Sequence, residues 1–316
     1  MYCSPVLISV LDRASHFKNC VDSLAKNTLA KETHLFIALD APFSEKHKAG
    51  YGKVLSYINE IEGFKEVTLF KREKNMGSTA NQFLAIEDIF KYYDRLIFTE
   101  DDNVFSKIFL DFINQGLELF KDRPDIISVA GHNYLIDIPK TYQSNYYIWP
   151  GFDAWGMGLW KEKWNKIDFS TNYNKTNPLT IKKIIELNSI AGHYVQALFK
   201  MAETGVLQND FAMCLHLIEN DMFSLFPTIS KVRNNGSDGS GENSGISGIY
   251  ANQTIDVAET IHLEIDEGSH PDYEIFLTLK RFFRLKNKSK IKLLIKYIKL
   301  IIFPKKQNSI GISSRN

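Results

Sequence analysis

The run Leu96-Ile97-Phe98-Thr99-Glu100-Asp101-Asp102 begins as an apolar, β-rich segment and ends in three adjacent carboxylates. Its beginning is typical of a buried strand. In open α/β sheets, ligands bind beyond the carboxyl ends of parallel strands. Three carboxylates at such an end repel one another, and a hard divalent cation relieves the repulsion. The run therefore predicts a site for a metal ion and a diphosphate at a sheet edge, although most acidic runs are solvated turns.

The residues around this run alternate short β-rich segments with helical patterns up to about residue 130. Such alternation favours an α/β fold, with a mostly parallel sheet and helices on its faces. We expect strands at Val6–Val10, His34–Leu39, Val67–Phe70, Arg95–Thr99 and Ile126–Val129, and helices near Phe17–Asn27, Glu45–Glu60, Thr79–Tyr93 and Ile108–Lys121. Residues 1–130 are thus predicted to form a Rossmann-like half.

Beyond Gly131 the sequence becomes aromatic-rich and irregular, with helical patterns around Tyr194–Glu203 and Phe211–Glu219. The segment Asn234–Gly248 is rich in Gly, Ser and Asn, and a loop of this length in a compact region is either functional or disordered. We expect residues 131–275 to form a second half that completes one domain over residues 1–275.

Three other predicted strand ends carry side chains suited to a nucleotide. Asp12-Arg13 follows the first strand and Leu39-Asp40 the second; a carboxylate accepts from a nucleobase or ribose, and a guanidinium clamps a phosphate. The residues from Lys71 to Ser78 follow the third strand and lead into a helix, whose N-terminus favours anions. Each feature alone also fits a cap or a turn, but together they line one edge of one sheet.

The order of these motifs resembles that of GT-A glycosyltransferases of family 2 and of the N-acetylglucosaminyltransferase I-like group. The resemblance covers roughly residues 4 to 243. It rests on Ser4-Pro5-Val6-Leu7-Ile8 with Asp12-Arg13, then Arg72-Glu73-Lys74-Asn75-Met76-Gly77, then Glu100-Asp101-Asp102, a helix, and Val129-Ala130-Gly131. It implies a GT-A fold with a mixed, mostly parallel sheet, in which residues 1–130 bind the nucleotide sugar and residues 131–275 bind the acceptor.

The resemblance also implies roles for individual residues. The acidic tripeptide is similar to the DXD motif of that family, which makes Asp102 the ligand of Mn²⁺ or Mg²⁺ and directs the two earlier acids toward the ribose and the sugar. Asp40 corresponds to the acid that recognises the base, usually uracil. The donor-binding residues implied in this way are Arg13, Asp40, Arg72, Asn75, Gly77, Ser78, Glu100, Asp101, Trp155 and Gly156.

The segment Ala154–Trp164 is similar to the family's WGWATW-like loop beside the donor sugar, which places Trp155 and Gly156 in that list. The alternative is that its tryptophans are ordinary core anchors, and we expect each interpretation to hold for different rings.

The family's catalytic base is an acid in the second half, near the start of a helix, and Asp210 in Gly205–Ala212 is placed like it. An N-cap role for Asp210 fits almost as well, and Asp153 and Asp221 are the reserve candidates. The segment Arg233–Asn243 resembles a donor-covering loop, N-x-G-x-D-x-S-G-x-H.

Asn243 stands where that loop has a His, so we expect no metal ligand there. His262, which lies further on, is more typical of a structural histidine.

The charge of the chain is uneven. Twelve of the 38 basic residues follow residue 279, with no acid among them, so the first 279 residues hold 26 basic against 37 acidic residues. Lys292, Lys296 and Lys299 share one face of a predicted helix whose other positions are apolar. Such a helix is too short to span a bilayer but suits an anionic membrane surface. We predict that residues 276–316 form a basic, membrane-associating segment, with docking on the protein's own core as the alternative.

The cysteine content, the N-terminus, the overall charge and the absent motifs bear on the cellular compartment and on which protein classes are excluded. Three cysteines without CxxC spacing and an N-terminus unlike a signal peptide favour a cytoplasmic protein, peripheral on the inner face of the cell membrane. The near-neutral overall charge speaks against nucleic-acid binding, and the absence of GxGxxG and GxxxxGK[ST] speaks against dehydrogenases and P-loop NTPases.

We therefore expect a metal-dependent transfer of a hexosyl or N-acetylhexosaminyl group from a nucleotide sugar, with UDP as the first choice of nucleotide, to a saccharide acceptor. The acceptor is expected on a membrane lipid, in surface polysaccharide or glycan synthesis, and inversion is implied by the resemblance alone. Two alternatives stay open: a non-catalytic saccharide-binding or scaffold relative, and a sugar nucleotidyltransferase. The second is disfavoured because Leu11–His16 contains no glycine.

Overall fold

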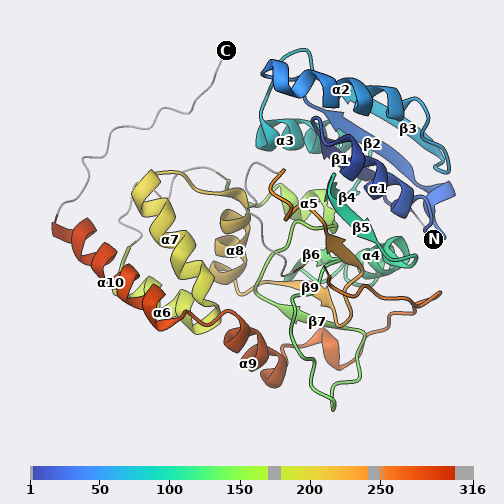
Figure 1. Cartoon of the computed structure of the whole chain (residues 1–316). Coiled ribbons are helices and arrows are strands. Elements are labelled where there is room, and N and C mark those ends of the chain that lie inside the picture. The colour runs from blue at the N-terminus through green and yellow to red at the C-terminus, as the bar shows by residue number, and fades with distance from the viewer. Residues whose placement is uncertain (1–2, 170–178, 241–249, 251, 303–316) are drawn as a thin grey trace.

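The computed structural model describes residues 3–169, 179–240, 250 and 252–302 (Figure 1). The strands are β1 (Val6–Val10), β2 (His34–Leu39), β3 (Glu66–Lys71), β4 (Arg95–Glu100), β5 (Asn103–Phe105), β6 (Ile126–Ala130), β7 (Tyr146–Trp149), β8 (Met157–Trp160), β9 (Phe223–Pro227) and β10 (Val232–Asn234). The α-helices are α1 (Ala14–Leu24), α2 (Glu45–Ile58), α3 (Ser78–Ile89), α4 (Phe109–Leu119), α5 (Lys161–Trp164), α6 (Ile181–Ile190), α7 (Gly192–Thr204), α8 (Asn209–Glu219), α9 (Tyr273–Phe282) and α10 (Asn287–Ile302).

Eight of these strands form one mixed sheet in the order β3-β2-β1-β4-β8-β6-β9-β7. The first four are parallel neighbours. β8 runs antiparallel between β4 and β6, β9 is parallel to β6, and β7 is an antiparallel edge strand. The predicted α/β class with a mostly parallel sheet is confirmed, and the carboxyl ends of β1, β2, β3 and β4 meet at one edge.

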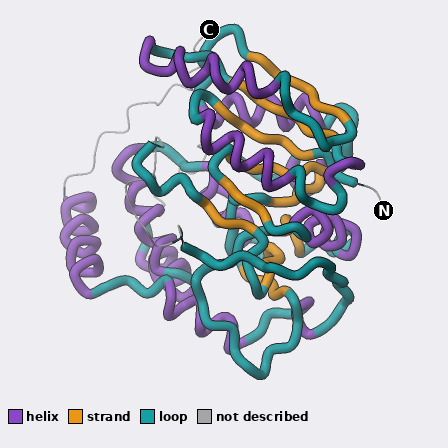
Figure 2. The backbone as a smooth tube through the Cα atoms, turned by 45° about the vertical axis from the view of Figure 1, so that its right-hand side comes forward, coloured by secondary structure: helices purple, strands orange, loops and turns teal. Residues whose placement is uncertain are grey.

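Alternate side chains of the strands enter two separate apolar cores, as the pleat of a sheet requires. Leu7 packs with residues of α3, α7 and α8, whereas its neighbours Val6 and Ile8 pack with residues of α1, α2 and α4. Figure 2 accordingly shows helices on both sides of the strands. Because both faces are covered, β1, β2 and β4 are mainly apolar and buried, which is why their runs are easy to recognise in the sequence.

The predicted boundaries differ from the observed ones by a few residues. β1 and β2 end where predicted, and β3, β4 and β6 are one or two residues longer. The first helix begins at Ala14 instead of Phe17, because the Phe17 amide already donates to the Arg13 carbonyl at 2.9 Å. α3 ends at Ile89, since the amides of Tyr92 and Tyr93 both donate to the Ile89 carbonyl and close the helix in a turn.

A small second sheet joins the two halves beside the acidic run. β5 pairs antiparallel with β10, with Asn234 opposite Asn103 and Val232 opposite Phe105. The pairing carries the chain that follows β10 back to the end of β4. Segments more than 100 residues apart in sequence are brought together in this way.

The C-terminal helices pack on the second half. α9 contributes the buried Ile275 and Leu279 to the core, so the boundary predicted after residue 275 falls inside a packed helix. α10 packs through Leu293, Tyr297 and Leu300, and Lys296 Nζ lies 2.5 Å from Glu203 Oε2 of α7. One side of α10 is therefore docked on the protein itself. No helix in the described part of the chain is long and apolar enough to cross a membrane.

Candidate functional site

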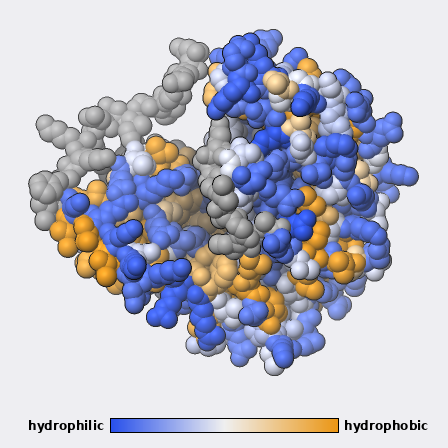
Figure 3. Space-filling view, viewed as in Figure 1, coloured by the Kyte–Doolittle hydropathy of each residue, from blue (hydrophilic) through white to orange (hydrophobic). Residues whose placement is uncertain are grey.

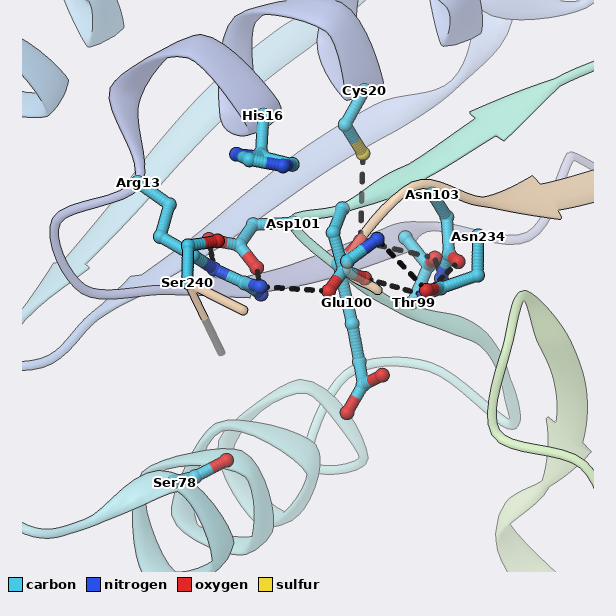
Figure 4. A network of polar contacts seen from close by, with 12 residues as sticks. Arg13, His16, Cys20, Ser78, Thr99, Glu100, Asp101, Asn103, Asn234 and Ser240 are labelled. Carbon is cyan, nitrogen blue, oxygen red and sulfur yellow. Dashed lines mark hydrogen bonds and ion pairs between the residues drawn. The ribbon is translucent and has the colours of Figure 1, made fainter. Parts of the chain in front are cut away.

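Arg13 and two of the three acids form the centre of the site. Arg13 immediately precedes α1, and its guanidinium contacts the carboxylate of Asp101 and lies 2.8 Å, at Nη1, from Asp102 Oδ2 (Figure 4). Burial alone lowers the pKa of Arg13, but the two carboxylates outweigh it and raise that pKa. The ends of β1 and β4 are thus joined by a charge network at the carboxyl edge of the sheet.

The acids together carry more negative charge than Arg13 balances. Burial raises the pKa of Asp101 to about 6 despite the guanidinium. Burial, together with the charges of Asp102, Asp210 and Asp101, raises the pKa of Glu100 to about 8. Such shifts indicate a place where an added cation is favoured, because it relieves the repulsion among the carboxylates.

Glu100 takes the opposite direction to its neighbour, as successive residues at a strand end do. In Figure 4 its carboxylate points away from Arg13 and Asp101, toward the helix that begins at Ser78. The charge of Asp210, which belongs to the second half of the molecule, is one of the causes that raise the pKa of Glu100.

Asp102 is held by the residues after β10. Asn234 Nδ2 donates to Asp102 Oδ1 at 2.7 Å, and the Asn235 amide donates to the Asp102 carbonyl at 2.9 Å. Gly236 approaches so closely that a Cβ there would lie 2.0 Å from Asp102 Oδ2. Asp102 is consequently buried and fixed in one orientation. The sequence singled out this loop by its pattern, but it gave no sign that the Asn234 side chain orients Asp102.

The residues present fit a Mn²⁺ or Mg²⁺ ion held jointly with a diphosphate. Among the described residues, no three His, Cys, Asp or Glu side chains form a metal-binding group. An all-protein cage is not required, because Mg²⁺ is commonly bound by one or two carboxylates together with substrate phosphates. Asp102 supplies a hard oxygen donor of this type, and the uncompensated charge around it suits a divalent cation.

Asp40 links the end of β2 to the turn before α3 by hydrogen bonds. Its carboxylate accepts from the amides of Ala41, Met76 and Gly77 at 2.8–2.9 Å and from Asn75 Nδ2 at 3.1 Å. These bonds occupy both oxygens of a buried side chain and fix the turn that precedes α3. Asp40 therefore shapes the predicted donor edge, and a nucleobase would have to compete for its oxygens.

The other residues predicted beside the donor lie along the start of α3. Arg72 Nε donates to Asn81 Oδ1 at 2.8 Å, so the guanidinium is turned toward the helix. Gly77, whose φ of +77° suits glycine, is the N-cap of α3, and Ser78 begins the helix and accepts from Gln82 Nε2 at 3.0 Å.

The tryptophans divide between core and site. Trp149 and Trp160 are buried in the cores. Trp155 is partly exposed and packs edge-on against His132, with ring centroids 4.7 Å apart. Gly156 has a φ of +73°, and a Cβ there would lie 2.9 Å from the Phe109 ring, so only glycine suits this position.

Asp210 lies in the first turn of α8. The N-cap of α8 is Gln208, and Asp210 forms no cap hydrogen bond, which argues against the alternative capping role. Its side chain reaches solvent, but the protein around the carboxyl and the charge of Asp153 raise its pKa to about 6. Asp210 thus lies within electrostatic range of both Asp153 and Glu100, although the three acids come from separate segments.

The reserve candidate Asp221 is placed differently. It adopts a φ of +52° in the turn after α8, next to the start of β9. Phe223 pairs with Ile126 there, at the amino end of β6, so Asp221 lies at the opposite sheet edge from Asp102. Asn243 lies outside the described residues, and His262 is exposed.

Comparisons with known proteins found distant likenesses in structure. No protein-family model matches the chain, and no curated protein does. A mannosyltransferase from Pyrobaculum calidifontis in complex with GDP-Man and Mn²⁺ is 10% identical over 72% of this chain and 57% of its own, with a TM-score of 0.38. S. aureus TarS 1-349 in complex with UDP-GlcNAc is 13% identical over 52% of this chain and 48% of its own, with a TM-score of 0.36. Mouse xyloside xylosyltransferase 1 is 13% identical over 58% of this chain and 74% of its own, with a TM-score of 0.32.

Proposed function

We propose that this chain is a metal-dependent glycosyltransferase of GT-A type that moves a sugar from a nucleotide donor, preferably UDP-linked, to a saccharide acceptor with inversion. One observation carries the proposal. The guanidinium of Arg13 and the oriented carboxylate of Asp102 meet at the carboxyl edge of the sheet, and Asp210, a carboxyl of raised pKa, acts electrostatically on the adjacent Glu100. These groups match the needs of diphosphate binding, cation binding and proton removal.

Arg13 and the start of α3 would hold the donor. The Arg13 guanidinium now contacts the carboxylates of Asp101 and Asp102, and by turning away from Asp102 it could donate to a phosphate. The turn fixed by Asp40 presents the N-terminus of α3, whose free backbone amides favour an anion. Glu100, which extends toward α3, is placed to form a hydrogen bond with the sugar.

Asp102 would hold Mn²⁺ or Mg²⁺, and the cation, when bound, neutralises charge that develops on the departing diphosphate. Asn234 donates a hydrogen bond to Asp102 Oδ1, so Asp102 Oδ2 is the oxygen that would bind a cation. Arg13 Nη1 now contacts that oxygen at 2.8 Å and would turn toward the phosphates instead.

Asp210 would take the proton from the attacking hydroxyl. A base of pKa near 6 is ionised at neutral pH and still basic enough to assist proton removal. In a single displacement, the acceptor oxygen forms a bond to the anomeric carbon while the bond to the diphosphate breaks. The leaving group departs with the electron pair, and the proton passes to Asp210.

A membrane surface is proposed as the place of action. The side of α10 away from the protein exposes an apolar stripe at helical spacing, with 47–59% of each side chain accessible: Ile291, Leu294, Ile295 and Ile298. Exposed lysines, among them Lys288, Lys292 and Lys299, adjoin this stripe on the same helix. Apolar side chains gather over the region of α10 in Figure 3. An apolar stripe bordered by lysines suits an anionic bilayer surface on the cytoplasmic side, where a lipid-linked saccharide in surface polysaccharide or glycan synthesis would be met.

The test is a screen of nucleotide sugars for Mn²⁺-dependent release of nucleoside diphosphate, run on the wild type and on Asp102→Ala. Asp88→Ala serves as the matched control, since it removes a carboxylate that pairs with Lys91 at the far end of α3. We expect turnover of one donor, lost in Asp102→Ala and kept in Asp88→Ala. Turnover of no donor, together with no binding of any, would favour a non-catalytic protein.

A further inference from the structure

His132 lies at the centre of a buried polar network on the acceptor side. It lies two residues beyond the end of β6 and is 0% exposed. Its Nδ1 is 2.8 Å from Asp153 Oδ2, and its Nε2 is 3.0 Å from Gln253 Oε1. Three aromatic rings surround the imidazole, with centroids 4.7–5.7 Å away: Tyr134, Trp155 and Tyr250.

The hydrogen bonds determine where the protons of this network lie. Gln253 Nε2 donates to the Asn133 carbonyl at 2.6 Å, so the Gln253 amide must present its oxygen to His132. His132 Nε2 therefore carries a proton, since an amide oxygen only accepts. The 2.8 Å contact between Nδ1 and Asp153 then requires a second proton between those two atoms. Whether this proton sits on nitrogen or on oxygen, the pair of His132 and Asp153 has no net charge.

Among the ionisable groups that contact His132 or lie next to it, Asp153 is the one that can carry a charge, because the neighbouring tyrosines stay neutral. Burial raises the pKa of Tyr134 well above its ordinary range and, with the charge of Asp153, that of Tyr250 to about 12, so both phenols stay neutral. The other oxygen of Asp153 accepts from the Trp155 amide at 2.9 Å. Asp153 is also the carboxylate whose charge acts on Asp210, so its protonation affects the proposed base.

Resting on the proposed function, we infer that His132 is a positioning residue that shares a proton with Asp153, weakens the charge that this carboxylate exerts on Asp210, and leaves Asp210 as the acid that accepts the proton. The arrangement lets two carboxylates lie near one acceptor hydroxyl without the full repulsion of two bare charges. It also fixes the turn that carries Trp155, because His132 contacts both Asp153 and the Trp155 ring. Asp210 then receives the hydroxyl proton, while Asp153 does not exchange one during the reaction.

The test compares pH profiles of kcat/KM in His132→Asn, Asp153→Asn and the double variant. The asparagine introduced by His132→Asn can still donate to Asp153 but holds no titrating proton, so Asp153 becomes a bare carboxylate. Its charge should move the acid limb of the profile upward by about one pH unit, a roughly tenfold loss below that limb. The double variant removes the charge and should return the limb to the wild-type position. An unmoved limb in His132→Asn, or loss of all turnover in Asp153→Asn, would overturn the inference.

A second readout does not depend on catalysis and so separates this inference from the proposed function. In the full chain with ¹⁵N-labelled histidine, NMR should show a protonated Nε2 on His132 and a strongly downfield proton shared by Nδ1. Both signals should vanish in His132→Asn. In Asp153→Asn only the downfield signal should vanish, and this variant provides the test if His132→Asn fails to fold. An unprotonated Nε2 on His132 would overturn the inference even in a protein that transfers sugar.

Discussion

Asn234 and Asp102, 132 residues apart in sequence, are joined by a hydrogen bond of 2.7 Å from the Asn234 amide nitrogen to Asp102 Oδ1. Asn234 also donates to Asn103 Oδ1 at 3.0 Å, so its side chain is fixed by β5 as well as by the acid. Asp102 is the proposed ligand of the cation, and groups that orient a metal ligand usually contribute strongly to metal affinity.

Replacing Asn234 with Ala should therefore weaken activation by Mn²⁺ by about 10- to 100-fold while leaving the fold intact. The measurement is the Mn²⁺ concentration needed for half-maximal donor hydrolysis. Asn235→Ala is the matched control, since the Asn235 side chain accepts from Arg233 and does not contact Asp102. Equal Mn²⁺ requirements in Asn234→Ala and the wild type would show that Asp102 needs no such support.

Gly236→Ala should displace Asp102, because the added Cβ would lie 2.0 Å from Asp102 Oδ2. We expect Mn²⁺-dependent hydrolysis to fall at least tenfold, in line with the loss of an oriented ligand. Gly52→Ala in α2 is the control, because nothing lies within 4 Å of its new Cβ. That control should keep full activity and gain roughly 0.5–1 kcal/mol of stability, measured by urea unfolding. Normal activity in Gly236→Ala would show that the close contact between Gly236 and Asp102 is not needed for activity.

Asp210→Asn should lower transfer by about 10²- to 10⁴-fold without weakening donor binding, as expected for loss of a general base. In the wild type, a base must be ionised to act, so kcat/KM should rise with pH through about 6 and level off above it. Asp221→Asn, at the other end of α8, is the control and should behave as the wild type. If Asp221→Asn rather than Asp210→Asn abolished transfer, the assignment of the base would be wrong.

Ile295→Glu combined with Ile298→Glu should release the protein from anionic vesicles, because two charges replace half of the exposed stripe on α10. Donor hydrolysis should not change, since these residues face away from the protein. Co-sedimentation with vesicles of phosphatidylglycerol and phosphatidylcholine measures the binding. The control is Val257→Glu, which alters another exposed apolar residue. Unchanged sedimentation of the double variant would remove the membrane proposal.

Substitution is preferred here to deletion of the C-terminal segment. Leu293 and Tyr297 of α10 pack on the core, and Lys296 pairs with Glu203, so a truncation would expose apolar surface on α7. The sequence predicted a helix with apolar and basic faces, but it could not show that one apolar stripe is docked and a second one exposed.

The elements of the first half were predictable because their signals are local. An apolar run such as Leu96–Phe98 indicates a strand that is buried on both faces, and the acids that follow it indicate where the strand ends. Hydrogen-bonding partners were not predictable in the same way. Asp40 is engaged by Met76 and Gly77, and His132 by Gln253, across 36 to 121 residues of chain. No pattern near either residue indicates those partners.

The most direct measurement is calorimetric titration of UDP into the wild type and into Asp102→Asn, each with and without Mn²⁺. We expect the wild type to bind UDP tightly only with Mn²⁺, and Asp102→Asn to lose this dependence while remaining folded. UDP binding of equal strength in all four titrations, or none in any of them, would contradict a cation-assisted nucleotide site at Arg13 and Asp102.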